Sequence, residues 1–203
     1  DWSSDVCSSD LAIGYRAAYN SSTGSSLVAI GANALFSSTV SNYNVAIGNA
    51  AFYSWNHTGT DGSSVAVGYS ALYSATLGNF NTAIGMQSLQ SNTTGSSGTA
   101  VGYQALYSNT TSSYNTALGQ QALYSTTGGS NVGIGYRAGY NNTSGYLVAI
   151  GNQAAFSHTV AQGTVAIGQS AAYSFQNNNN DSYASTFVGQ LAGYSTTAAI
   201  DVT

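Results

Sequence analysis

The hydrophobic pattern of this chain is a short motif that returns at a nearly constant interval. A tripeptide that ends in an aliphatic residue and Gly, and begins with a small residue in ten of its copies, occurs eleven times. Successive glycines are separated by 16 to 21 residues, most often by 17. These glycines are Gly14, Gly31, Gly48, Gly68, Gly85, Gly102, Gly119, Gly135, Gly151, Gly168 and Gly189. A fixed period of this kind indicates a repeat protein, in which each copy of the motif forms one structural unit.

Alignment of the copies on this glycine gives columns of similar residues. The third residue after Gly is Ala in ten of the eleven copies, the fifth is Tyr or Phe in ten, and the eighth is Thr in eight. The residue two before Gly is small in ten copies. The residue directly before Gly is always aliphatic, for example Ile47, Ile84, Ile150 and Ile167. We expect these columns to be the structural framework of the repeat.

The unit length and its hydrophobic runs predict an all-β fold. About 17 residues is too short for a helical-pair repeat. The runs T/V-A-I and A-L-Y are both β-prone and are bounded by Gly or by Ser, Asn and Thr, so each unit should hold two short strands and two turns. We therefore predict a parallel β-solenoid of about eleven coils, stacked about 4.8 Å apart into a rod roughly 50 Å long.

Alternation of side chains along these strands bears on assembly. In an extended backbone, the first and third residues of T/V-A-I share one face and Ala points to the other, and A-L-Y divides in the same way. Both strands are then apolar on both faces, although a narrow roll has only one interior. Two interpretations fit: a homo-oligomer in which small Ala side chains let chains approach, or a solvent-facing Ala that costs little. The pattern does not identify the interior face.

A longer period divides the repeat into blocks. Gly14 and Gly135 lie 121 residues apart, and Gly31 and Gly151 lie 120 residues apart. Each separation corresponds to seven coils. We predict one repeat domain over residues 12–197, with blocks that start near 12 and 133 and a second block that is incomplete, followed by a cut end at 198–203. Segments 53–64 and 173–185 are longer than the other units and should bulge outward as loops.

The opening segment, DWSSDVCSSDL, has a different composition. It holds three of the six acidic residues and the only Cys of the chain, and it lacks the repeat columns. Its residues are those encoded by a standard short-read sequencing adapter. We therefore expect residues 1–11 to be an artefact without a fold, rather than a leader or a redox site.

Composition excludes several function classes. Charged residues are 4% of the chain, with two Lys or Arg and six Asp or Glu, so no basic surface exists for nucleic acid or anionic lipid. No apolar run is long enough for a transmembrane helix. Acidic residues do not cluster, and Cys and His lack metal-ligand spacing. We expect no catalytic activity, no metal and no cofactor.

The candidate contact residues lie in the two long units. They are Trp55, His57, Asp61, Phe175, Asn178, Asn179 and Asp181. Exposed aromatic and Asn side chains suit contact with carbohydrate or protein, but packing of the loops explains Trp55 and Phe175 equally well. Turn formation is the favoured role of the two Asp residues. Arg16 and Arg137 follow Tyr in equivalent copies, where they stack on aromatic rings or are displayed at the surface.

Residues 81–95 (NTAIGMQSLQSNTTG) and 115–129 (NTALGQQALYSTTGG) resemble the head repeats of YadA-like trimeric autotransporter adhesins. Similar units are found in phage tail fibres. The resemblance covers residues 12 to about 195 and implies a left-handed β-roll, three chains side by side, and a location on a bacterial outer membrane or a virion. The copies here are longer than the familiar adhesin repeat, and no anchor, stalk or neck motif is present.

The leading functional hypothesis is a non-enzymatic fibre or adhesin head that displays binding loops to an extracellular protein or carbohydrate receptor. The second is an ice-binding solenoid, because a regular Thr ladder can order water. The third is a structural spacer without a ligand. An adhesin and a phage fibre are equally compatible with these residues.

Overall fold

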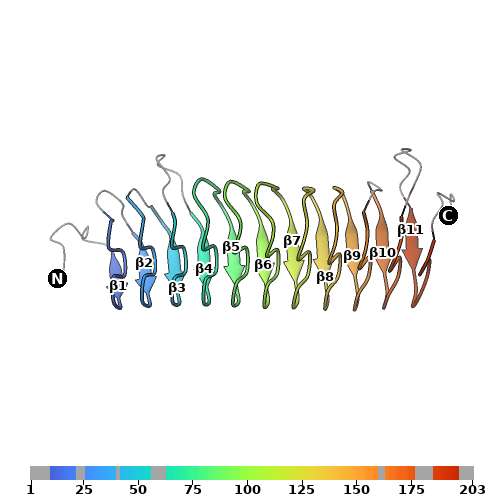
Figure 1. The fold of residues 1–203 in the computed structure, drawn as a ribbon, viewed down its shortest axis with the longest axis horizontal. Coiled ribbons are helices and arrows are strands. Elements are labelled where there is room, and N and C mark those ends of the chain that lie inside the picture. Colours follow the sequence, from blue (N-terminus) through green and yellow to red (C-terminus); the bar gives the residue numbers. More distant parts are fainter. Residues whose placement is uncertain are drawn as a thin grey trace.

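The chain folds into a rod of stacked coils. The computed structural model describes residues 10–21, 26–39, 42–55, 63–159, 163–176 and 185–196. Across these ranges, eleven three-residue strands lie side by side in sequence order (Figure 1). The strands are β1 (Leu11–Ile13), β2 (Val28–Ile30), β3 (Val45–Ile47), β4 (Val65–Val67), β5 (Thr82–Ile84), β6 (Thr99–Val101), β7 (Thr116–Leu118), β8 (Val132–Ile134), β9 (Val148–Ile150), β10 (Val165–Ile167) and β11 (Thr186–Val188).

All strands belong to one parallel sheet with a single register. Ala29 pairs with Ala46, and each later strand continues the same columns. The register is kept across the two long units, because Val45 pairs with Val65 and Val165 with Thr186. The prediction of an all-β parallel solenoid with about 17 residues per coil is therefore confirmed.

The prediction of a second strand in each coil is wrong for the described residues. The A-L-Y segment is a turn in which the second and fourth residues after Gly have positive φ, such as 54° at Gln104 and 53° at Leu106. Hydrogen bonds still join these turns from coil to coil: the Leu106 N–H donates to the Ala122 carbonyl at 3.0 Å. Inter-coil bonding therefore continues around the coil, although the backbone is not extended.

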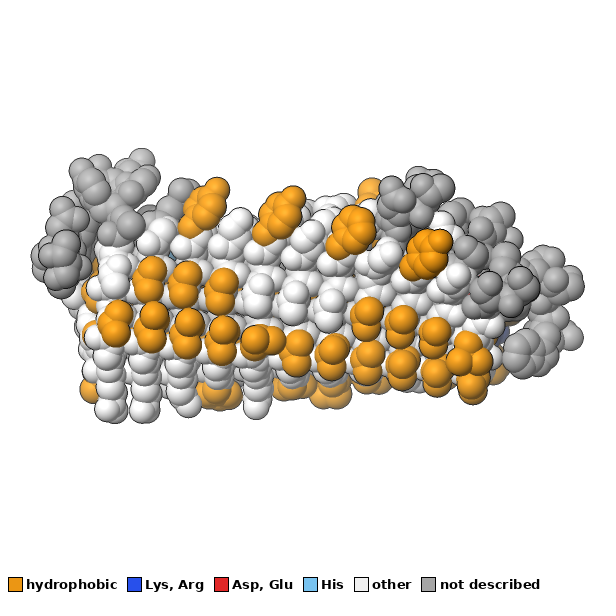
Figure 2. Space-filling view, turned by 180° about the vertical axis from the view of Figure 1, so that it is seen from behind, with side chains coloured by type: hydrophobic (Ala, Val, Ile, Leu, Met, Phe, Trp, Pro, Cys, Tyr) orange, Lys and Arg blue, Asp and Glu red, His pale blue; other side chains and the backbone are white. Residues whose placement is uncertain are grey.

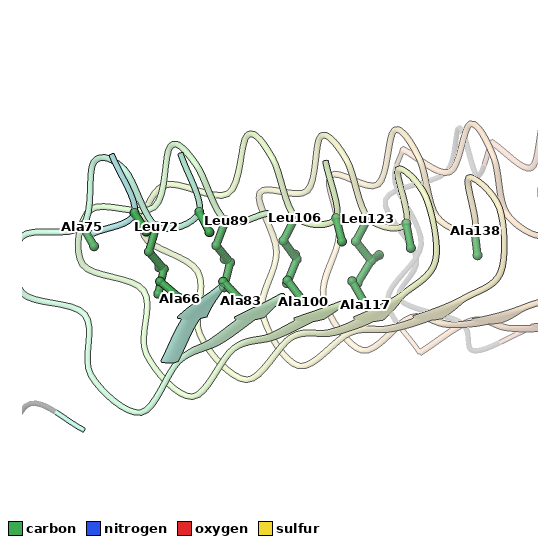
Figure 3. Close-up of a cluster of buried hydrophobic side chains, with 14 of the residues drawn as sticks. Ala66, Leu72, Ala75, Ala83, Leu89, Ala100, Leu106, Ala117, Leu123 and Ala138 are labelled. Carbon is green, nitrogen blue, oxygen red and sulfur yellow. The ribbon is translucent and has the colours of Figure 1, made fainter. Parts of the chain in front are cut away.

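The interior of the roll is filled by Ala from the strands and by Leu from the turns. Ala83 and Ala100 point from β5 and β6 toward Leu89 and Leu106, and all four side chains are fully buried (Figure 3). Ala105, the residue before Leu106, is also buried. Two expectations from alternation are thus wrong. Alternation placed the Ala and Leu of A-L-Y on opposite faces, but both point into the interior. The strand Ala is buried, so it is not at the surface where it could let chains approach.

Buried Asn side chains form the polar part of the interior. The Oδ1 atom of Asn81, four residues before Gly, accepts from the Gly98 N–H at 2.8 Å in the next coil. Farther along the coil, Asn109 Nδ2 donates to Asn92 Oδ1 at 3.1 Å. A buried amide needs such partners because leaving it unpaired is costly. Asn that recurs just before the strands therefore caps the backbone of the neighbouring coil.

The repeat begins earlier than the sequence indicated. Leu11 lies in β1 and pairs with Val28, and Asp10 Oδ1 accepts from the Leu27 N–H at 3.0 Å. The expectation that residues 1–11 take no part in the fold is therefore wrong for Asp10 and Leu11. Asp10 takes the place that Asn occupies in other coils, because a carboxylate oxygen accepts the same hydrogen bond.

Candidate interaction surfaces

The outward side of the sheet is an apolar surface, here called the strand face. It consists of the first and third residues of every strand. Figure 2 shows these residues as two parallel rows along the rod, with the upper row polar over β5, β6, β7 and β11, whose first residue is Thr. The third residues are Ile13, Ile30, Ile47, Val67, Ile84, Val101, Leu118, Ile134, Ile150, Ile167 and Val188.

The residues of the strand face are exposed or half-buried over the length of the rod. Ile84 in the middle is 41% exposed, and Val188 near one end is 65% exposed. None of its residues carries a charge. Single exposed aliphatic residues are ordinary, but a continuous apolar surface indicates a site of association. Ile47, Ile84, Ile150 and Ile167, which the sequence identified as framework residues, thus lie on the outside of the roll.

The fifth residue after each Gly forms a second feature, here called the aromatic column. Its members are Tyr19, Phe36, Tyr53, Tyr73, Tyr107, Tyr124, Tyr140, Phe156, Tyr173 and Tyr194. Neighbouring rings are stacked, with centroids 4.9 to 5.5 Å apart. Burial, followed by the nearby Tyr140 and Tyr107, raises the pKa of Tyr124. The column is interrupted at Gln90, which stands between Tyr73 and Tyr107.

The two arginines stack on these aromatic rings. The Arg16 guanidinium lies 5.6 Å from the centre of the Tyr19 ring, and that of Arg137 lies 5.3 Å from the centre of the Tyr140 ring. Arg137 also ends a ladder of Gln side chains, because its Nε donates to Gln121 Oε1 at 2.8 Å. The predicted stacking of guanidinium on aromatic rings is confirmed, and its energy is of the order of 1 kcal/mol at exposed sites.

His158 belongs to the buried polar ladder. Its Nδ1 lies 3.1 Å from Asn142 Oδ1, and its Nε2 lies 3.0 Å from Thr164 Oγ1. Because Asn142 Oδ1 only accepts, the neutral ring donates from Nδ1 and accepts from the Thr164 hydroxyl at Nε2. Burial lowers the pKa of His158 to about 4. Within the described ranges no three His, Cys, Asp or Glu side chains lie close enough to hold a metal ion.

The structure places only part of the predicted contact residues. Trp55 and Phe175 are buried; the Trp55 ring packs edge-on against Phe52, with centroids 4.8 Å apart. They are therefore interior residues in this structure, as the packing alternative proposed, and do not form an exposed contact surface. The other candidates, His57, Asp61, Asn178, Asn179 and Asp181, lie outside the described residues.

The Thr column eight residues after Gly lies in a turn rather than on a strand. Its hydroxyl groups bond along the rod: Thr93 Oγ1 donates to the Thr110 carbonyl at 3.0 Å, and Thr76 Oγ1 to the Thr93 carbonyl at 3.1 Å. These donors are thus occupied within the protein.

The columns compared in the sequence did not reveal a row of exposed aromatic side chains. It lies five residues before Gly and consists of Tyr43, Phe80, Tyr114 and Tyr146, here called the ring row. These residues lie on alternate coils. The three coils between them carry Ser63, Ser97 and Ser130 at the same place, and the coil before Tyr43 carries Ser26. Comparison of alternate copies rather than successive ones is the signal that identifies it.

Together these features define a parallel β-solenoid with an apolar strand face and long ladders of aromatic and amide side chains. Comparisons with protein families, curated proteins and solved structures find no significant match to this chain. Within the described ranges there is no helix with the length and hydrophobicity that crossing a membrane requires.

Proposed function

We propose that this chain is a non-enzymatic module of an extracellular fibre, in which three copies pack side by side through the strand face. The fibre projects from a bacterial outer membrane or a virion and carries groups that contact an extracellular protein or carbohydrate receptor. The observation that carries the proposal is the strand face, whose third residues are aliphatic in every strand and are exposed or half-buried along the rod.

The physical argument starts from the cost of exposed apolar surface. Burial of such a face contributes roughly 25 cal/mol for each Å² removed from water. A second copy of the rod is a suitable partner, because it presents the same flat rows at the same coil spacing. The near absence of charge lets copies approach without repulsion. Closed cyclic symmetry would leave no strand face exposed, and three chains is the number that the resemblance to autotransporter heads implies.

Measurement of mass in solution tests the assembly. Light scattering of the whole chain should give three times its mass. The double variant Ile84→Asn, Leu118→Asn should fall to a single chain and keep its β-sheet circular dichroism. Met86→Asn is the matched control, because Met86 is exposed one residue after Gly85, outside the strand face, and this variant should stay trimeric. A wild-type chain that is monomeric at high concentration would contradict the proposal.

Loop display is tested by deletion. Removal of three residues within 56–62 and of four within 177–184 returns both units to 17 residues and spares the buried Trp55 and Phe175, so the rod should keep its melting temperature. Attachment of the protein to host cells should be lost if the two long units carry the contact groups. Unchanged attachment would locate the contact groups elsewhere on the rod.

The ice-binding and spacer alternatives have weaker support. The described Thr hydroxyl groups that donate to carbonyls of the next coil are less free to order water. We expect no thermal hysteresis in an ice-growth assay at concentrations where the protein is trimeric. A spacer is favoured only if neither the long units nor the rod surface binds any receptor.

A further inference from the structure

The ring row combines exposure with an unusual backbone. Tyr43, Phe80, Tyr114 and Tyr146 are 59 to 69% exposed, so their rings gain little from packing within the protein. All four have positive φ, between 57° and 62°. A bulky side chain in this region of φ is rare, because the left-handed conformation favours Gly, Asn and Asp. Stability therefore does not explain why aromatic residues occupy these positions.

The backbone beneath the ring row is fixed. The Tyr114 N–H donates to the Ser96 carbonyl at 3.1 Å, and the Tyr146 N–H donates to the Gly129 carbonyl at 3.2 Å, each in the preceding coil. In the coil between Phe80 and Tyr114, the Ser97 N–H makes the equivalent bond to the Asn79 carbonyl at 2.9 Å. The rings are thus held on a rigid ladder, which lowers the entropy that a ligand must overcome on binding.

The spacing of the rings selects the ligand. Successive rings lie two coils apart, which is about 9.6 Å at the usual strand separation. They stand out as separate side chains along one edge of the rod, beside the strand face (Figure 2). Ser97 and Ser130, on the coils between them, offer hydroxyl groups that donate and accept hydrogen bonds. No charged residue occurs in this column.

We propose that the ring row is a binding site for an extended β-1,4-linked glycan that lies parallel to the rod. In such a chain each pyranose ring is close to one coil in length, and the same sugar face returns at every second ring. Alternate sugars would stack on Tyr43, Phe80, Tyr114 and Tyr146, since a pyranose presents an apolar C–H face to an aromatic ring. The intervening Ser residues would bond the hydroxyl groups of the other sugars.

This inference names a ligand class for the displayed surface and so rests on the proposed fibre function. It uses neither of the long units, and it concerns side chains outside the strand face. Glycan binding and mass are therefore independent measurements, and the failure of one does not imply the failure of the other.

The test uses the full chain with two probes, the hexaoses of β-1,4-linked glucose and of β-1,4-linked N-acetylglucosamine. We expect calorimetric binding of at least one, and no binding of the α-1,4-linked glucose hexaose, whose chain curves. A hexaose reaches three successive rings, so replacement of all four rings by Ser, the native residue of the alternate coils, should weaken binding by about a hundredfold, at roughly fivefold for each ring in contact. The melting temperature should not fall, because the rings are exposed.

Two further variants distinguish a requirement for the two-coil spacing from non-specific binding to exposed aromatic rings. Tyr114→Ser combined with Ser130→Tyr keeps four rings but breaks the two-coil interval, so a hexaose loses one ring contact and binding should fall by about fivefold. Tyr69→Gln combined with Tyr103→Gln removes exposed rings one residue after Gly and should leave binding unchanged. The proposal is overturned if the wild type binds neither β-linked hexaose, or if the shifted variant binds as tightly as the wild type. It is also overturned if the four-Ser variant loses its trimeric mass, which would make the ring row a contact between copies.

Discussion

The carbonyl oxygen of Gly119 lies 2.6 Å from the position that a Cβ atom would take on Gly102. The same contact recurs along the rod, where one coil rests on the backbone of the next. Gly102 also has a φ of 134°, which L side chains rarely adopt. The glycine column is therefore fixed by close approach of backbones as well as by conformation.

Gly102→Ala should destabilise the rod by about 3 kcal/mol or more, from backbone strain and overpacking together. Thermal and urea unfolding monitored by circular dichroism will measure the loss. Gly189→Ala is the matched control: its φ is 123°, but nothing lies within 4 Å of the added Cβ. It should cost only the strain, about 1–2 kcal/mol. Equal losses in the two variants would show that coil contact is not the cause.

The stability of the rod should depend on pH through His158. Its pKa is lowered to about 4 in the folded chain, so the unfolded chain binds the proton more readily. This contribution is complete above the unfolded pKa of about 6.5 and is lost as the pH falls toward 4, by about 3 kcal/mol in total. Urea unfolding at pH 7.5 and at pH 4 measures it. His158→Asn, which introduces the residue found at Asn142 in the same column, should reduce the pH dependence; an unchanged dependence would refute the assignment.

Gln90→Tyr should stabilise the rod by about 1 kcal/mol. Gln90 interrupts the aromatic column between Tyr73 and Tyr107, and its buried Oε1 has no hydrogen-bond partner among the described residues. A ring there would complete the stack and remove an unsatisfied acceptor. The melting temperature should rise, whereas Tyr124→Gln, the reverse change within the column, should lower it. A lower melting temperature for Gln90→Tyr would mean that the gap serves another purpose.

Trp55→Ala should lower the free energy of unfolding by about 3–5 kcal/mol, because the side chain is buried against Phe52. Tyr146→Ala, which removes an exposed ring of the ring row, should change it by no more than about 0.5 kcal/mol. Urea unfolding of the two variants compares them directly. If Trp55→Ala unfolds like the wild type, the ring does not belong to the interior.

Much of the architecture could be predicted from the columns alone. Some residue types return every 17 positions, as Gly does at Gly85 and Gly102. This period implies that equivalent backbone atoms lie above one another. The number of coils, the parallel register and the hydrogen-bonded Asn and Thr ladders follow from that stacking. The continuity of register across the two long units also follows, because the columns resume at Val65 and Thr186.

Only the tertiary structure decided which side chains point into the interior of the roll. Alternation assumes an extended backbone, and this holds for the strands, where Ala83 points inward and Ile84 outward. It fails after each Gly, because positive φ at Gln104 and Leu106 rotates Leu106 into the interior beside Ala105. The sequence by itself determined a solenoid of stacked coils. The closure of each turn decided which side chains are buried and which are exposed. It determined the burial of Trp55 and Phe175 and the exposure of the strand face and of the ring row.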